Sequence, residues 1–211
     1  MDWSIKRNRS KFTGKEELFL TGPKPEAIRL GRVWGGLSWP GVKAGYLLVM
    51  AQADNKEGRP LYLVAEKEKD LTRDLVKAAA DIQNTYHVKT WYHIGGDQAQ
   101  PYMTEAYRAL DGIADEKRPS FQDAPEYPPE YALTLLKQSM VQEHLKLHPD
   151  LSRLMDELTQ ISQAQDPLAK LEGMPAVRAL MLLLGAVERA PWPPRDYSKL
   201  LEGGITKTYG H

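Results

Sequence analysis

Two carboxylates in this chain lie at the ends of expected strands, and a histidine lies close to one of them. Asp97 comes directly after an apolar strand that ends near His93, and Glu66 ends another strand. Carboxylate oxygens are the ligands that Mg²⁺ prefers in proteins, and a histidine beside a bound phosphate can act as a general base. Asp97 and Glu66 are therefore candidate metal ligands and catalytic residues, and His93 is a third candidate catalytic residue.

The first expected strand lacks the acid that such chemistry requires. Hydrolysis of a phosphodiester with two metal ions needs several carboxylates close together, because two cations about 3.5–4 Å apart must be charge-balanced. Residues 28–34 contain no Asp or Glu, and carry Arg32 and Trp34 instead. Asp97 and Glu66 alone could hold one weakly bound Mg²⁺ or Mn²⁺, so we expect either no cofactor or a weak one.

The elements that would position these residues begin with three strands. Apolar runs bounded by turn residues predict them at residues 28–34, 45–51 and 60–66. Their short connections predict an antiparallel meander, and the glycines, tryptophans and proline of residues 34–41 predict a loop that ends the first strand. Asp70 is the expected N-cap of a helix that reaches Tyr86, and a strand follows at 88–94. A crossover of this length implies parallel pairing.

The second half of the chain is mainly helical. We expect a helix from Pro101, a short strand at 119–122, helices at about 130–142 and 150–164, and a buried last helix that starts at Pro175. The fold class is therefore α/β, with a mixed five-stranded sheet, antiparallel in its meander and parallel beyond it, flanked by helices. The expected boundaries are a basic N-terminal arm at 1–27, one domain at 28–190 and an extended tail at 191–211.

Composition limits the classes of partner. The chain has 211 residues, 42% of them hydrophobic and 27% charged, and its formal net charge is zero. Binding to nucleic acid would therefore need a local basic patch rather than a bulk charge. There is no cysteine, no apolar N-terminal run and no apolar run long enough to cross a bilayer. We expect a cytoplasmic protein that does not enter a membrane.

The order of the elements resembles the ribonuclease-H-like fold, and most closely the nuclease domain of phage terminase large subunits. The matching segments are residues 62–66, which resemble the third strand; 92–97 followed by Pro101, which resemble the fourth strand and its metal-binding Asp; 131–158; and 174–180. The resemblance implies a Mg- or Mn-dependent DNA endonuclease that takes part in DNA packaging, with Asp97 and Glu66 among its metal ligands.

Two positions depart from the pattern of that family. The ligand of the first strand would align near Arg32 or Trp34, and the ligand of the last helix would align near Arg178, which carries a permanent positive charge. No GxxxxGK sequence is present, so the ATPase half of a terminase is absent. We therefore expect a degenerate phage or prophage relative that has lost nuclease activity and binds DNA or a phage packaging protein. Its arginines would pair with Asp97 or Glu66, or bind a phosphate.

Two alternatives stay open on the sequence alone. One is an active nuclease that uses Asp97, Glu66 and a third acid, either Asp54 or Glu188. The other is an unrelated small-molecule or protein-interaction domain whose strand order only mimics this fold. Trp34, as a candidate binding residue with Arg32 and Arg178, could stack on a base or simply pack over the sheet.

Overall fold

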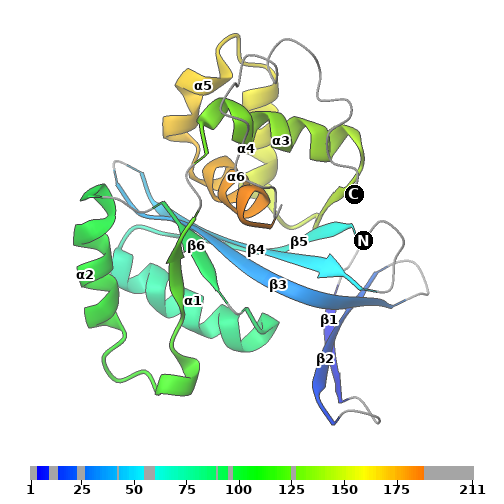
Figure 1. Ribbon diagram of the computed structural model, residues 1–211, viewed down its shortest axis with the longest axis vertical. Helices are drawn as coiled ribbons and strands as arrows, with labels where there is room; N and C mark the ends of the chain where they lie inside the picture. The colour runs from blue at the N-terminus through cyan, green and yellow to red at the C-terminus, as the bar shows by residue number, and fades with distance from the viewer. Residues whose placement is uncertain are drawn as a thin grey trace.

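The computed structural model describes residues 4–9, 14–22, 27–41, 43–54, 60–88, 90–94, 97–124 and 127–187, apart from the side chain of Asp97. A mixed sheet forms the centre of the molecule, with helices on both of its faces and a two-stranded hairpin that projects from one end (Figure 1). The expected tail at 191–211 and the candidate acid Glu188 lie outside the described residues.

Five strands form the core of the sheet. The strands β3 (Ile28–Ser38), β4 (Gly45–Ala53) and β5 (Leu61–Lys69) are an antiparallel meander. The strand β6 (Trp91–His93) pairs parallel with β3, and β7 (Phe121–Asp123) pairs parallel with β6. The order β7-β6-β3-β4-β5 is the ribonuclease-H-like arrangement, so the expected fold class is confirmed. A short strand β8 (Leu145–Leu147) pairs parallel with β5 at the other edge.

The first core strand is longer than the sequence predicts. The expected loop at 34–41 is wrong as far as Ser38, because β3 continues through Gly35 and Gly36. A Cβ atom on Gly35 would lie 2.1 Å from the ring of Trp91, and one on Gly36 would lie 2.6 Å from the carbonyl oxygen of Ala179. These glycines therefore let a tryptophan and a helix backbone approach the strand, and they do not mark a turn.

Strands also replace the expected N-terminal arm. Residues Ser4–Arg9 form β1 and Glu16–Thr21 form β2, which pair antiparallel with each other and extend the sheet from β3. Leu18 and Leu20 are buried, whereas Glu17 and Phe19 are only half-buried. This alternation is the signature of a strand with one buried face, and it outweighs the basic composition of the segment.

Two helices cover one face of the sheet. They are α1 (Thr72–Tyr86) and α2 (Gln100–Ala109), with short 3₁₀ turns at Asp97–Ala99 and Asp115–Lys117 (Figure 1). Leu75, Ala79 and Ile82 of α1 pack against the apolar side chains of β3, β4 and β5 that point to this face. The expected cap by Asp70 is wrong, because the N-cap residue is Leu71 and no side chain caps this helix.

The C-terminal helices cover the other face. They are α3 (Pro129–Val141), α4 (Ser152–Ser162), the single turn α5 (Pro167–Lys170), a 3₁₀ turn at Leu171–Gly173, and α6 (Pro175–Val187). The helix α6 lies between the sheet and the outer helices, as its apolar sequence predicts, and nine of its residues are buried. Among the described residues, no helix is long and apolar enough to cross a membrane.

Candidate functional site

The parallel pair β3–β6 fixes which residues meet at the centre of the sheet. Gly35 pairs with Trp91 and Leu37 pairs with His93, so Ser38 and Trp39 are the residues of β3 that follow the end of β6. Arg32 is exposed and lies five residues before Leu37, roughly 16 Å back along the strand. Trp34 pairs with Met50 and packs against the apolar cluster beneath α6. The structure therefore does not bring Arg32 to the end of β6.

Arg178 does lie at that end. It is half-buried near the start of α6 and lines a pocket of about 540 Å³ together with Ser38, Trp39, Lys43 and Gln98. It also lines an adjoining pocket of about 470 Å³, which Ile94 and Tyr127 help to form. Among the residues that the structure describes, none gives the Arg178 side chain an ion pair or a hydrogen bond. The guanidinium group therefore lines both pockets without a partner among the described side chains.

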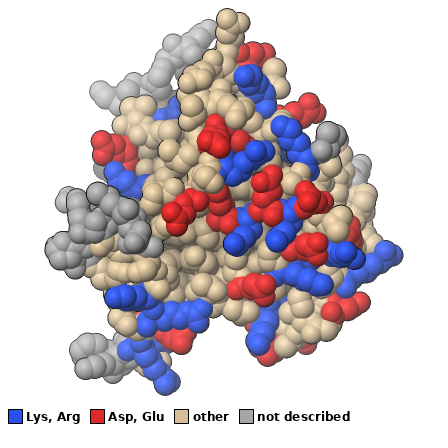
Figure 2. All heavy atoms as spheres, turned by 180° about the vertical axis from the view of Figure 1, so that it is seen from behind, with Lys and Arg blue, Asp and Glu red and all other residues tan. Residues whose placement is uncertain are grey.

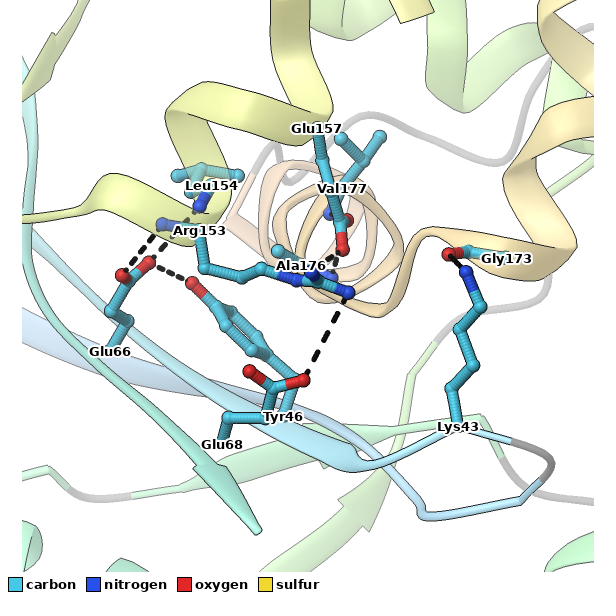
Figure 3. A network of polar contacts seen from close by, with 10 residues as sticks. All are labelled: Lys43, Tyr46, Glu66, Glu68, Arg153, Leu154, Glu157, Gly173, Ala176 and Val177. Atoms are coloured by element: carbon cyan, nitrogen blue, oxygen red, sulfur yellow. Dashed lines mark hydrogen bonds and ion pairs between the residues drawn. The ribbon is translucent and has the colours of Figure 1, made fainter. Parts of the chain in front are cut away.

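A second cation lies in the first pocket. The Lys43 Nζ atom donates a hydrogen bond to the carbonyl oxygen of Gly173 at 2.9 Å, which places it close to the start of α6 (Figure 3). Glu172 is the acidic side chain among the residues that line this pocket. Among the described residues of this lining, two cations, one acid and the neutral donors of Gln98 and Ser38 make an environment suited to an anion rather than to a metal ion.

Glu66 has a different set of partners. Its carboxylate accepts hydrogen bonds from the backbone N–H groups of Arg153 and Leu154 at 3.1 and 3.2 Å, and from the hydroxyl group of Tyr46 (Figure 3). The two amides belong to the first turn of α4, where backbone N–H groups lack partners within the helix. Glu66 therefore holds the start of α4 on the sheet, and both of its oxygens are in use. The pKa of Tyr46 is raised, mainly by burial and secondly by the hydrogen bond to Glu66.

Glu157 does the same for α6. Its Oε2 atom accepts hydrogen bonds from the amides of Ala176 and Val177 at 2.8 and 3.0 Å, and only 2% of the residue is exposed. Burial raises the pKa of Glu157, although the two amides and the Arg153 guanidinium act in the opposite direction. Two glutamates thus anchor two helix N-termini on one face of the sheet, where the helix dipole favours a negative charge.

The side chain of Arg153 lies between two acids, Glu157 and Glu68. The Arg153 Nε atom lies 3.0 Å from Glu157 Oε1, and its Nη2 atom lies 3.9 Å from Glu68 Oε1 (Figure 3). The first contact is close enough for a strong ion pair, although the two atoms are not aligned as a hydrogen bond. The predicted pairing of Arg32 or Arg178 with Glu66 is wrong, because the arginine among the glutamates is Arg153, which meets Glu66 through its backbone amide. Pairing of either arginine with Asp97 stays a prediction, because the Asp97 side chain lies outside the described atoms.

The remaining sequence-predicted residues lie apart from Glu66. Asp97 begins the 3₁₀ turn that follows β6, and its side chain lies outside the described atoms. The strands β4 and β3 separate β5 from β6, so the strand of Glu66 is about 14 Å from the strand before Asp97. The structure therefore does not bring these two strands within the spacing of one metal centre. Asp54 is exposed at the end of β4, against Gly31.

His93 is buried on the face of α1 and α2. Only 3% of the residue is exposed, and its ring meets Trp39 edge-on at a centroid distance of 5.4 Å. The Nδ1 atom lies 3.1 Å from the carbonyl oxygen of Ile94 and 3.6 Å from a carboxylate oxygen of Asp123. Among the described residues, the His93 ring therefore contacts Trp39, the Ile94 carbonyl group and Asp123, and it does not share a site with Glu66.

The described residues do not fit a two-metal centre. No three of their His, Asp and Glu side chains are grouped so that they could hold a metal ion. Both oxygens of Glu66 are hydrogen-bonded to protein, and Arg178 places a positive charge in the pocket at the end of β3 and β6. A cation would be repelled there unless further acids balanced the charge of the guanidinium group.

Sequence reasoning missed the residues that hold the helices in place. Glu157 carried a usable signal, because it lies on the apolar stripe of α4 with Leu154, Leu158 and Ile161. An acid on a buried helix face needs a partner, and a helix N-terminus is one such partner. Tyr46, Lys43 and Arg153 carried no comparable signal, because each looks like an ordinary strand, loop or helix residue until the sheet and helices are assembled.

The known proteins that are similar to this chain are solved structures of low sequence identity. No protein-family model and no curated protein matches the sequence. Among solved structures, the nuclease domain of the P22 large terminase is 12% identical, with a TM-score of 0.45 over 71% of this chain and 80% of that one. The g2p large-terminase nuclease domain of bacteriophage SPP1 with bound Mn is 13% identical, with a TM-score of 0.39 over 61% of this chain and 68% of that one. The fowlpox virus Holliday junction resolvase is 11% identical, with a TM-score of 0.41 over 72% of this chain and 95% of that one.

Proposed function

We propose that this chain is a nucleic-acid-binding domain of the ribonuclease-H-like fold that has lost metal-dependent hydrolysis. The observation that carries the proposal is the half-buried Arg178 guanidinium, which has no partner among the described side chains and lines the pocket at the ends of β3 and β6. A phosphate of the nucleic-acid backbone is the ligand that suits this group, because a guanidinium can give it two parallel hydrogen bonds. Lys43 and Gln98 would contact the same phosphate or the next one.

The hydrogen bonds of Glu66 and Glu157 to protein groups support the proposed loss of metal-dependent hydrolysis. Glu66 is bound to Tyr46 and to the first turn of α4, and Glu157 is bound to Arg153 and to the first turn of α6. Releasing either carboxylate for a metal ion would leave backbone amides without partners, at a cost of about 1–3 kcal/mol for each buried group. The finer assignment, a phage or prophage protein related to terminases that meets DNA or a packaging protein, is part of this proposal.

Replacing Arg178 tests the binding half of the proposal. We expect Arg178→Gln to weaken binding of a short fluorescein-labelled DNA about tenfold at fixed salt, because it removes a charge-assisted hydrogen bond and one phosphate contact. The measurement is fluorescence anisotropy. Arg73→Gln is the matched control, since Arg73 is exposed on α1 and pairs with the neighbouring Asp74. Equal affinity of Arg178→Gln and Arg73→Gln would contradict the role of Arg178, and a wild-type protein that binds no DNA would contradict the proposal as a whole.

Titration with Mn²⁺ tests the catalytic half. Calorimetry up to millimolar Mn²⁺ should give no saturable heat, and supercoiled plasmid incubated with the protein and Mn²⁺ should stay intact, because Glu66 and Glu157 are bound to protein groups. Asp97→Ala is the comparison, since Asp97 is the candidate ligand whose side chain the structure leaves undescribed. Nicking by the wild type that disappears in Asp97→Ala would establish the active nuclease instead.

A further inference from the structure

The hairpin β1–β2 and the start of β3 present one row of three side chains to the same face. Lys6 pairs with Phe19, and Phe19 pairs with Arg29, so the three residues lie side by side across three antiparallel strands. Directly opposite residues have Cβ atoms about 5 Å apart and point to the same face of a sheet. We call the row Lys6, Phe19 and Arg29 the hairpin face. It consists of an aromatic ring with a cation on each side.

Phe19 points away from the apolar core. Its neighbours Leu18 and Leu20 are 4% and 1% exposed and belong to the cluster under α1, whereas Phe19 is half-buried and belongs to none of the three apolar clusters. Phe121, by contrast, packs against two of those clusters. Phe19 thus leaves part of a phenyl ring uncovered by the core, beside the exposed Lys6 and an Arg29 side chain that is 45% exposed.

The charge around the hairpin face is positive. Residues 4–9, 14–22 and 27–32 carry six cations, Lys6, Arg7, Arg9, Lys15, Arg29 and Arg32, and only two acids, Glu16 and Glu17. Glu17 lies 4.0 Å from Arg29, and Glu16 lies 3.3 Å from the His87 ring. Figure 2 shows Lys and Arg predominating at the hairpin end, at the lower left, whereas both signs alternate across the middle of that face. A chain with zero net charge therefore has a local basic patch.

We propose that the hairpin face binds single-stranded nucleic acid, with one base stacked on Phe19 and the flanking phosphates contacted by Lys6 and Arg29. The inference rests on the proposed nucleic-acid function and adds a second site and a strand preference to it. A phenyl ring can stack on a base only where that base is not already stacked between its neighbours, which excludes the interior of a duplex. The hairpin projects from the body of the molecule, so a strand can reach it without displacing a helix (Figure 1).

Substitutions at Phe19 test the proposal. We expect Phe19→Leu to weaken binding of fluorescein-labelled oligothymidine about tenfold, while binding of a duplex changes less than twofold, because leucine fills the position but cannot stack. Phe19→Tyr, which keeps the ring, should bind oligothymidine like the wild type. Lys6→Gln should weaken binding and reduce its salt dependence by about one phosphate contact. Lys77→Gln, an exposed position on α1, is the charge-matched control. Melting temperatures confirm that each variant is folded.

The outcomes separate this inference from the function on which it rests. A wild-type protein that binds oligothymidine, an Arg178→Gln variant that binds it weakly, and a Phe19→Leu variant that binds it normally would overturn the hairpin face alone. Equal losses in Phe19→Leu for duplex and single strand would overturn the strand preference and with it the stacking. A wild-type protein that binds neither form of DNA would overturn both proposals, and the row would then be better tested as a surface for an acidic protein.

Discussion

Glu157→Ala is expected to lower the free energy of unfolding by about 1–3 kcal/mol for each buried amide that it leaves without an acceptor. The substitution leaves the amides of Ala176 and Val177 without an acceptor at the start of α6, and it leaves Arg153 without its closest acid. Since α6 lies between the sheet and the outer helices, the loss of these hydrogen bonds should loosen the packing of the apolar cluster to which α6 belongs. Urea denaturation followed by circular dichroism measures it.

Glu157→Gln separates the charge of this residue from its hydrogen bonds. Its amide oxygen can still accept from the α6 amides, so the destabilisation should be smaller than that of Glu157→Ala. Burial raises the pKa of Glu157 in the folded protein, so the folded state favours the protonated acid more than the unfolded state does. The contribution of Glu157 is then complete below its ordinary pKa of 4.5 and declines as the pH rises through the raised pKa.

The pH dependence therefore has a definite sign. The stability of the wild type relative to Glu157→Gln should fall as the pH rises from about 4 upward, since glutamine does not titrate. Glu130→Gln, at an exposed position in the first turn of α3, is the charge-matched control. A wild type whose advantage over Glu157→Gln grows with pH would mean that Arg153 and the amides outweigh burial at this carboxylate.

Gly36→Ala is the second substitution with a large expected effect, a loss of about 1–3 kcal/mol in the free energy of unfolding. The added Cβ atom would lie 2.6 Å from the carbonyl oxygen of Ala179 and 2.7 Å from Leu183 Cγ. The first of these atoms belongs to the backbone of α6, so relief requires the whole helix to move away from the sheet. That movement would also shift Arg178 relative to Ser38 in the proposed phosphate pocket.

Gly41→Ala is the matched control, since it makes the same chemical change at a position with space. The nearest atom to its added Cβ would be the Tyr102 hydroxyl oxygen, at 3.9 Å. We expect its stability to stay within about 0.5 kcal/mol of the wild type. Equal melting temperatures for Gly36→Ala and Gly41→Ala would show that α6 does not rest on β3 as closely as described.

Much of the fold could be predicted from local patterns. The three strands of the meander, the crossover helix, the parallel fourth strand and the buried last helix all appear where the apolar periodicity places them. The errors occurred where composition and periodicity compete. Gly35 and Gly36 resemble a turn but make room for Trp91 and α6, and the basic residues of β1 resemble a solvated arm although Leu18 and Leu20 anchor its partner strand.

The candidate site was less accessible to sequence reasoning, because its contacts join residues far apart in the chain. Glu66 meets the amide of Arg153, which is 87 positions later, and only the crossing of α4 over β5 brings them together. The sequence showed that the first strand lacks an acid and that arginines stand near the expected ligand positions. It did not show which arginine would meet which acid, because the partner depends on strand order and on the angle at which each helix crosses the sheet.

The sequence by itself therefore determined the order of the elements and the shortage of carboxylates, since periodicity and residue type are local properties. The tertiary structure decided how the charges are used. In the folded chain, Glu66 accepts hydrogen bonds from the N-terminus of α4, and Glu157 accepts them from the N-terminus of α6. Arg153 lies between Glu68 and Glu157. The tertiary structure also placed Arg178 in the lining of a pocket. Ionic partners are selected by distances of a few ångströms, and those distances exist only after the sheet and its helices have packed.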